Sequence, residues 1–346
     1  MADYTYRSWE TMSPFYPVQE ITYYRIFDDE DNAEDNVDPI WSGVVLPGYS
    51  LSHLENILTQ YVQPQPLDYL TDNTVRTDFD MCKTFYVTSS IDNDNWYSEG
   101  SIKIYYDWSY DYNSLSPNIH PVILTSMTSH VVDPRQYFFL SSCAYDEYNN
   151  LYILRQGTII QWYDPVRDTY KHGEISLAAK GFKDGDYLVV MHIYYTGTSY
   201  YYFPVKTTCH NYCLYYMNER GGYDTFLIDG KETQRDKMTP NTYKKNYNYT
   251  LPQNTNINVD PGTIVYRKDI KESWELNTGW LNEDNAERAT SLLHSTRVYL
   301  HDFNKDTVTP VVITNSTADH KTYKNQNRRL IQYVINVESA QEKHVE

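Results

Sequence analysis

The segment 209–213, with the sequence Cys-His-Asn-Tyr-Cys, is the local cluster whose residue types best suit a metal. A structural zinc site needs four ligands, which often come from two paired clusters. The two other cysteines, Cys82 and Cys143, are isolated in the sequence. In a β-strand, Cys209 and Cys213 would face the same side. We therefore expect buried structural thiols at 209 and 213, with no metal and no cofactor.

Acidic residues beside aromatic ones raise glycoside hydrolysis as a second possible chemistry. Paired carboxylates about 5–10 Å apart can protonate a leaving oxygen while the second acts as nucleophile or base. Asp107–Asp111 and Asp146-Glu147 have a suitable composition. In a chain with 46 acidic residues, however, some fall beside Trp or Tyr by chance. We expect no catalytic residue at either place. A non-catalytic sugar-binding face, with Tyr and Trp stacked on sugar rings, stays open as an alternative.

Other catalytic signatures are missing from the sequence. Gly230-Lys231 is followed by Glu232 rather than Ser or Thr, and no glycine lies five residues before it, so it is no phosphate-binding loop. The chain also lacks a Gly-x-Ser-x-Gly and a His-Glu-x-x-His motif. We therefore predict that the protein is not an enzyme.

Composition excludes several classes of protein. The chain has 346 residues, including 37 Tyr, 10 Phe and 7 Trp, with 46 acids against 29 bases for a net charge of −17. Its length suggests two or three domains. The sequence has no apolar run of the roughly 18 residues that a spanning helix needs, and its N-terminus does not resemble a secretory signal. Net acidity argues against wrapping nucleic acid.

The acidity is concentrated at one end of the chain. Residues 1–120 carry 20 acids and 5 bases, whereas residues 241–346 carry 13 of each. The densest acidic run does not fit a calcium-binding EF-hand loop, because Ala33 takes the sixth position and Pro39 the twelfth. We interpret the run as a solvated loop, or as a surface that repels passing DNA. Its members are Asp28, Asp29, Glu30, Asp31, Glu34, Asp35 and Asp38.

Most readable segments predict β-strands, which Tyr, Trp, Val, Ile and Thr all favour. Ser101–Trp108 alternates apolar and polar residues. Asp186–Tyr195 and Tyr200–Val205 are typical of a hairpin around a turn at 196–199. Three shorter runs of the same kind are Arg297–Leu300, Val311–Thr314 and Ile331–Val337.

Helical signals are few. A capping box at Ser52–Glu55 predicts a helix that ends before Pro64, and Asn282 is placed to cap a second helix through about Leu293. The segment Thr239–Asp260 has no periodicity, so we interpret it as a long loop or an extended arm.

The fold class expected from these patterns is mainly β, with several β-sandwich-like or β-barrel-like domains and a few short helices. We predict an N-terminal arm at 1–20, an acidic β-rich domain with one helix at 21–117, and a β-sandwich-like domain at 118–206. The remaining residues, 207–346, form a C-terminal β-rich domain with one helix and the long loop at 239–260.

The most distinctive passage runs from Thr207 to Lys231. Tyr212–Met217 and Tyr223–Ile228 predict two strands, and Gly221-Gly222 supplies the positive φ angles that a tight reversal needs. The passage resembles one in tail and neck structural proteins of phages that infect Bacteroidetes, the crAss-like phages among them. There, Leu-Tyr-Tyr-Leu-Asn precedes Gly-Gly-Trp-Asp, and Met217 and Tyr223 are mild departures from that pattern.

Later segments are similar to the same proteins, so that the resemblance covers roughly residues 205–340. They include 273–280, the predicted helix and the closing strands. The positions that carry it are Tyr212, Tyr215, Gly221, Gly222, Tyr223, Asp224 and Trp274. Their role is either contact between subunits or packing within the C-terminal domain.

This resemblance implies a virion structural protein, made in the host cytoplasm and placed in a ring of the phage tail barrel or neck. Such rings are typically twelve-fold. The implied partners are other copies of the chain, neighbouring tail, neck or portal-adaptor proteins, and DNA that passes without specific binding; no membrane is implied. Two alternatives remain: another virion component, such as a baseplate, fibre-adaptor or capsid-associated protein, and a carbohydrate-binding module or glycan depolymerase.

Overall fold

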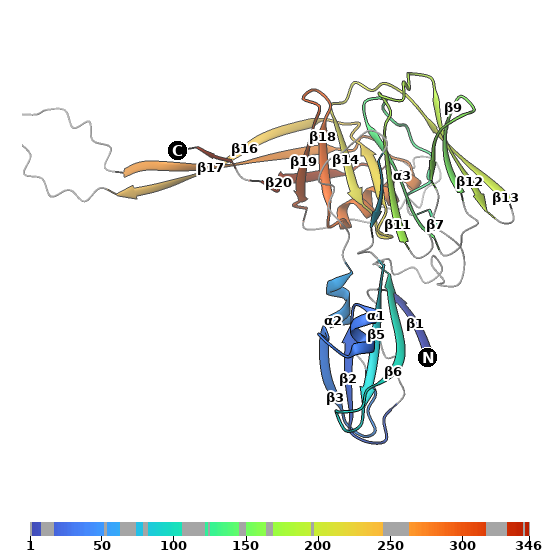
Figure 1. Cartoon of the computed structure of the whole chain (residues 1–346). Helices are drawn as coiled ribbons and strands as arrows, with labels where there is room; N and C mark the ends of the chain where they lie inside the picture. The colour runs from blue at the N-terminus through green and yellow to red at the C-terminus, as the bar shows by residue number, and fades with distance from the viewer. Residues whose placement is uncertain are drawn as a thin grey trace, which may run out of the picture. The chain divides into compact units, whose positions relative to one another are not determined.

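Strands dominate the computed structural model of the chain (Figure 1). The structure describes residues 2–7, 17–51, 54–62, 74–78, 82–105, 122–123, 125–144, 150–163, 169–194, 197–244, 263–315, 331–341 and 343–345. Its contacts group into two compact units, which are Met1–Cys209 with Tyr216–Thr225, and His210–Tyr215 with Phe226–Glu346. The predicted fold class is confirmed, since the described residues form several largely antiparallel sheets and a few short helices.

The first sheet contains five strands in the order β1-β6-β5-β2-β3. All its pairings are antiparallel except that of β1 with β6. Alternate residues face the core, as the pleat requires; Ile102 and Ile104 on β6 are fully buried, as their spacing predicts. The strands are β1 (Ala2–Arg7), β2 (Thr22–Phe27), β3 (Trp41–Val45), β5 (Cys82–Ser90) and β6 (Tyr97–Tyr105). Tyr106 and Trp108, predicted for the same strand face, lie outside the described residues.

Most of the acidic run is helical rather than a loop, which corrects that part of our interpretation, while Asp28 and Asp38 lie outside the helix. It forms the short helix α1 (Glu30–Asp35), with Asp29 as its N-cap. The Asp29 carboxylate accepts hydrogen bonds from the backbone N–H groups of Asp31 and Asn32, at 2.9 and 3.3 Å. Acidic side chains near a helix N-terminus also interact favourably with its dipole. Capping therefore gives helical structure to a segment that has no apolar periodicity.

Two four-stranded sheets form a β-sandwich around one core. Their strand orders are β10-β9-β12-β13 and β4-β11-β8-β7. Phe138 on β8, Ile153 on β9 and Phe203 on β13 are fully buried or nearly so and belong to one cluster. The strands are β4 (Thr74–Asp78), β7 (Val122–Ile123), β8 (Tyr137–Ala144), β9 (Asn150–Arg155), β10 (Thr158–Tyr163), β11 (Thr169–Ser176), β12 (Tyr187–Tyr194) and β13 (Gly197–Pro204).

This sandwich contains both an expected and an unexpected pairing. The β12–β13 hairpin runs from Tyr187↔Pro204 to Tyr194↔Gly197, close to the sequence prediction. In contrast, β4 pairs with β11, about 95 residues later, although it lies within the segment 21–117 that we assigned to the acidic domain. The predicted domain boundaries otherwise stay a prediction.

The C-terminal sheet has eight strands in the order β15-β14-β18-β19-β20-β17-β16, with β21 paired to β17. The predicted hairpin of residues 212–228 provides its first two strands. The strands are β14 (Tyr212–Met217), β15 (Tyr223–Leu227), β16 (Glu232–Lys244), β17 (Thr263–Asn277), β18 (Val298–Asp302), β19 (Thr307–Ile313), β20 (Val334–Ser339) and β21 (Lys343–Val345).

The long-loop prediction is corrected over its first residues. Thr239–Lys244 belongs to β16, which pairs with β17 from Glu232↔Leu276 to Lys244↔Thr263. The remainder of the predicted loop, residues 245–260, lies outside the described residues. Most residues of β16 are exposed, whereas most of β17 are half-buried. The sequence of β16 therefore lacks the apolar alternation that identifies a half-buried strand.

Both predicted helices are present. The first is α2 (Glu55–Leu58), continued by the 3-10 turn η1 (Thr59–Tyr61); Ser52 of its capping box lies outside the described residues. The second is α3 (Glu283–His294), with Asn282 as its N-cap. In the described part of the chain, none of the helices is long and apolar enough to cross a membrane.

The Asn282 cap leads to a prediction about the stability of the protein. Its side-chain oxygen accepts a hydrogen bond of 2.9 Å from the backbone N–H of Asn285. Asn282→Ala removes that acceptor and is expected to lower the free energy of unfolding by about 1 kcal/mol, measured by urea denaturation. Glu287→Ala, at an exposed position of the same helix, is the control and should change stability by less than about 0.5 kcal/mol. Equal effects of the two variants would contradict this account.

Candidate assembly site

The β14–β15 hairpin, which carries the family resemblance, is part of the protein's interior. Tyr215 and Tyr216 are fully buried, and Tyr223 is 1% exposed. The Tyr215 hydroxyl lies 2.7 Å from Nδ1 of His301 on β18, so the buried ring has a polar partner. Large aromatic side chains with satisfied hydroxyls are suited to holding a hairpin against its sheet.

A buried amide–carboxylate pair closes the tip of this hairpin. Nδ2 of Asn218 donates to Oδ2 of Asp224 at 2.8 Å. The Asn218 side-chain oxygen accepts from the backbone N–H groups of Arg220 and Gly222, both at 3.0 Å. Gly221 has φ of +80°, a conformation that a glycine adopts without strain. These bonds explain the spacing between Asn218, the two glycines and Asp224.

The hairpin tip is also bonded to the sandwich, with which residues 216–225 form one unit. The second oxygen of Asp224, Oδ1, accepts from the backbone N–H of Ser126 at 2.7 Å. Backbone N–H of Tyr223 donates to the Ser141 hydroxyl at 3.0 Å. Thr125 donates to the Tyr223 carbonyl at 3.2 Å. The Asp224 carboxylate is 2% exposed, yet each of its two oxygens has a hydrogen-bond donor.

The second unit holds the base of the same hairpin. The Arg288 guanidinium of α3 lies 5.8 Å from the centre of the Phe226 ring. At Gly230, a Cβ atom would stand 2.6 Å from the Asn277 carbonyl oxygen, so only glycine fits there. Trp274 on β17 is 6% exposed and Tyr212 is half-buried. These contacts are packing contacts, and a role of the same residues in assembly stays a prediction.

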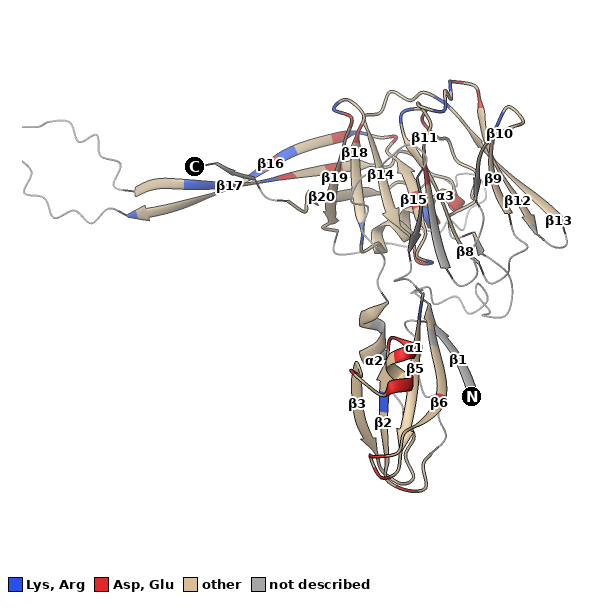
Figure 2. Ribbon diagram, viewed as in Figure 1, with Lys and Arg blue, Asp and Glu red and all other residues tan. Residues whose placement is uncertain are grey.

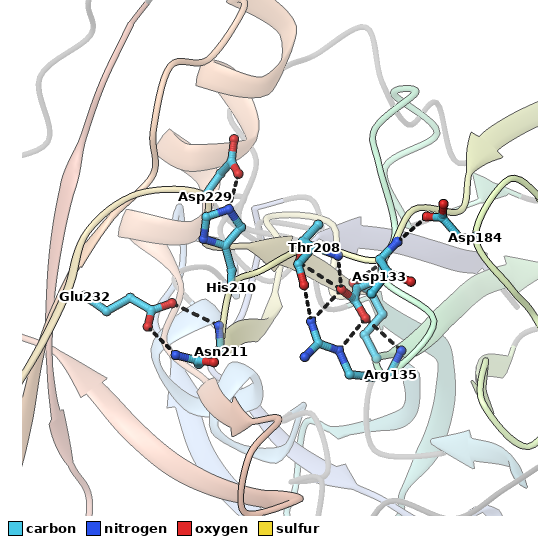
Figure 3. A network of polar contacts seen from close by, with 10 residues as sticks. Asp133, Arg135, Asp184, Thr208, His210, Asn211, Asp229 and Glu232 are labelled. Atoms are coloured by element: carbon cyan, nitrogen blue, oxygen red, sulfur yellow. Dashed lines mark hydrogen bonds and ion pairs between the residues drawn. The ribbon is translucent and has the colours of Figure 1, made fainter.

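The segment 207–211, between β13 and β14, is held by polar side chains (Figure 3). Asp133, whose side chain is fully buried, accepts from Arg135 through both oxygens at 2.8 Å. It also accepts from the backbone N–H and hydroxyl of Thr208, each at 2.8 Å. Burial raises the pKa of the Asp133 carboxyl, but these hydrogen bonds outweigh it and hold the pKa below its ordinary value.

Two further residues of that segment have partners in the second unit. Nε2 of His210 pairs with the Asp229 carboxylate. The backbone N–H and side-chain amide of Asn211 donate to Glu232, at 3.1 and 3.2 Å. Thr208 is therefore held within the first unit, and His210 and Asn211 are held within the second.

The cysteine prediction is partly wrong. Cys213 is buried, but Cys209 is exposed, because β14 begins only at Tyr212 and residue 209 lies before the sheet. Within the described residues, no three His, Cys, Asp or Glu side chains gather as a metal site would require. The glycosidase candidates, Asp107–Asp111 and Asp146-Glu147, lie outside the described part of the chain.

The outer half of the β16–β17 ribbon is the most exposed apolar surface of the C-terminal sheet. We call residues 236–244 and 263–272 the arm; in Figure 1 it extends beyond β18, β19 and β20. Met238 is 56% exposed and Tyr266 57% exposed. The rings of Tyr243 and Tyr266 lie 6.2 Å apart across the two strands. No other described strand flanks β16. On the other side of the ribbon, β20 pairs with the base of β17 at Ser273–Asn277, and β21 pairs with Lys268–Ile270 of the arm.

Charged residues at the base and middle of the ribbon are paired with one another. Arg235 contacts Glu275 at 3.0 Å, and Lys271 contacts Glu338 at 3.2 Å. Farther out, Asp269 accepts from Arg267 at 2.6 Å and from Asn241 at 2.7 Å. Surface pairs of this kind contribute only about 0–1 kcal/mol each to stability. They do not cover the exposed apolar residues of the arm.

The acidic run lies on the surface, as predicted. All seven of its carboxylate side chains are exposed, and Figure 2 shows them in red on α1 and the adjoining turns. Three apolar residues that follow in the sequence are also exposed: Val37, Val44 and Leu46. The strand that carries Val44, β3, is at the edge of its sheet.

Sequence patterns missed the polar residues that organise the hairpin and the 207–211 segment. Asn218, Ser126, Asp133 and Arg135 were not singled out. Ser126, Asp133 and Arg135 each bond a residue that lies 73 to 98 positions away in the sequence. The Asn-x-x-Gly-Gly spacing was a usable signal for Asn218, since Asn side chains commonly bond the backbone of a following turn.

Removing the Asp224 carboxylate should destabilise the protein strongly. Asp224→Ala leaves the Ser126 N–H and the Asn218 amide without this acceptor, so we expect the free energy of unfolding to fall by about 2–4 kcal/mol, measured by urea denaturation. Glu219→Ala, in the same turn, is the control and should cost less than about 0.5 kcal/mol. A loss no larger in Asp224→Ala than in the control would show that the pair does not hold the hairpin.

Asp133 should make stability depend on pH. Because its folded pKa is depressed, its contribution is complete above the unfolded carboxyl pKa of about 4 and is lost as pH falls toward the folded value. At pH 7, Asp133→Asn should therefore be less stable than the wild type by about 2 kcal/mol. Urea denaturation between pH 7 and 3 should show this difference shrinking only below about pH 4. A difference that grows on acidification would contradict the assignment.

Comparison with known proteins identifies no family. No family model and no curated protein matches the chain. Among solved structures, fibronectin(III)-like modules of Clostridium thermocellum CbhA align at 10% identity over 60% of this chain and 90% of theirs, with a TM-score of 0.18. Drosophila OTK extracellular domains 3–5 align at 8% identity over 80% and 90%, with a TM-score of 0.24. Similarity at this level carries no argument about activity, ligand or partner.

Proposed function

We propose that this chain is a virion structural protein, a subunit of a closed ring in the tail barrel or neck of a phage. The ring forms part of the passage for DNA and links portal-side and tail components. The sequence resemblance over residues 205–340 supports the virion class, and the arm supports an assembling subunit. The arm is the observation on which the proposal mainly rests.

The physical argument starts from the instability of isolated hairpins. Beyond Lys268, where its pairing with β21 ends, the arm has only two strands. A two-stranded ribbon without further cover is at best marginally stable in water, because neither face buries enough apolar surface. The arm nevertheless keeps Met238, Tyr243 and Tyr266 exposed. Tyr and Met are enriched in the buried centres of protein interfaces. A neighbouring subunit that covers the arm would supply the missing burial.

Ring formation also matches the chain's asymmetry. A ring subunit needs two different surfaces that meet in a heterologous contact, and rotation then closes the assembly. The arm supplies one such surface. A net charge of −17 supports a lumen past which DNA slides, since like charge prevents the passing phosphates from binding.

A second candidate function, carbohydrate binding, is favoured by one observation. Tyr187, Tyr200 and Tyr202 are each more than half exposed. The register pairs Val189 with Tyr202 and Met191 with Tyr200, which places these tyrosines on one face of β12 and β13. A flat row of aromatic rings of this kind is suited to stacking on sugar rings.

The arm-deletion variant tests the ring proposal. Replacing Pro240–Lys268 by Asn-Gly joins the paired residues Thr239 and Asp269 with a tight turn. We expect the folded variant to need at least about 100-fold more protein to assemble, as the loss of two interface anchors predicts. Mass photometry measures the oligomers of both proteins, and circular dichroism checks the fold.

Tyr200→Ser with Tyr202→Ser is the matched control, because it removes exposed tyrosines outside the arm. Under the ring proposal this control assembles like the wild type. Assembly that survives arm deletion would contradict the proposal. Retention of the wild type on immobilised polysaccharide, lost in the control variant, would favour the carbohydrate-binding function instead.

A further inference from the structure

We propose that the arm of one copy binds the acidic surface around α1 and β3 of the next copy. We call this surface, residues 28–46, the receiver. The inference rests on the proposed function and names the two surfaces that meet in the ring. Each copy carries both surfaces, as a heterologous contact that closes by rotation requires.

Charge complementarity is the first argument. The receiver contains seven acids and no Lys or Arg, whereas the arm contains five bases and three acids. Lys244 and Lys268 are exposed on the described strands of the arm. Figure 2 shows the basic bands on β16 and β17 and the acidic residues on α1. Complementary potentials steer such surfaces together and exclude wrong partners.

Apolar complementarity is the second argument. The receiver exposes Val37 at 50%, Val44 at 54% and Leu46 at 56%, in the same stretch of chain as its carboxylates. The arm likewise exposes apolar residues, among them Met238 and Tyr266, next to its basic side chains. Contact between the two would bury apolar surface on both sides while their opposite charges pair at the rim.

The edge strand of the arm indicates that the contact is made through side chains rather than through backbone pairing. Pro240 lies within β16 and cannot donate a backbone hydrogen bond, and Lys237 and Lys244 lie on the same edge strand. Proline and lysine on an edge strand prevent indiscriminate pairing with other strands. The arm is therefore suited to one defined surface rather than to any free sheet edge.

Charge reversal on the full-length chain tests the contact. Lys244→Glu with Lys268→Glu reverses two charges of the arm, and Glu34→Lys with Asp35→Lys reverses two charges of the receiver without altering the Asp29 cap of α1. Each double variant should assemble about tenfold or more weakly than the wild type, and combining all four changes should restore most of the loss. Lys183→Glu with Lys206→Glu, two exposed lysines elsewhere, is the control with the same change in net charge as the arm variant.

Zero-length carbodiimide crosslinking gives a second readout on wild-type protein. In a mixture of nitrogen-14 and nitrogen-15 chains, we expect isotopically mixed amide links between Lys244 or Lys268 and carboxylates of residues 28–38. Raising the salt concentration should weaken both the links and assembly, because exposed charges are screened.

The outcomes separate this inference from the proposed function. If ring assembly depends on the arm but is unchanged by either charge-reversal pair, the receiver inference is wrong and the ring proposal stands. The same holds if the combined variant does not recover assembly. If the wild-type protein does not assemble, both the receiver inference and the ring proposal are wrong. Loss of duplex-DNA binding on arm reversal, with assembly unchanged, would show that the arm contacts nucleic acid instead.

Discussion

The organisation of this protein depends on full hydrogen bonding of two buried carboxylates. Asp224 is enclosed at the tip of the β14–β15 hairpin, and Asp133 is enclosed beside the segment that leads into it. An unpaired carboxylate at either place would be costly, yet each accepts hydrogen bonds from a side chain and from the backbone. One partner of each, Ser126 for Asp224 and Thr208 for Asp133, comes from a distant part of the chain, so folding of the sandwich and formation of the hairpin reinforce each other.

The arm is the opposite case, since β21 pairs with only three of its residues and Met238, Tyr243 and Tyr266 stay exposed. A single chain can leave such a ribbon exposed only at a cost in stability, whereas an assembly covers it with a neighbour. The same contrast separates the residues of the family resemblance from those that we assign to assembly. Tyr215, Tyr223 and Asp224 make contacts within the chain, and our proposal assigns Tyr243 and Tyr266 to contact with another copy.

Local sequence signals predicted the elements that short-range physics determines. The Asn282 cap, the β12–β13 hairpin and the strands around Gly221-Gly222 were all expected, because capping, alternation and turn chemistry act over a few residues. Three features were missed for physical reasons. The pairing of β4 with β11 is non-local, β16 has no half-buried face, and the acidic run forms α1 through the Asp29 cap rather than through apolar periodicity. For the candidate site, the sequence indicated the acidic run and an unusual segment near 239–260. It did not indicate that the first residues of that segment belong to an exposed ribbon.

Single-particle imaging of the purified full-length protein tests the central claim most directly. The account predicts closed rings in which the β16–β17 ribbon of each subunit extends onto the next subunit and is covered there. A population of monomers at the highest attainable concentration, or rings in which the ribbon remains in solvent on every subunit, would contradict it.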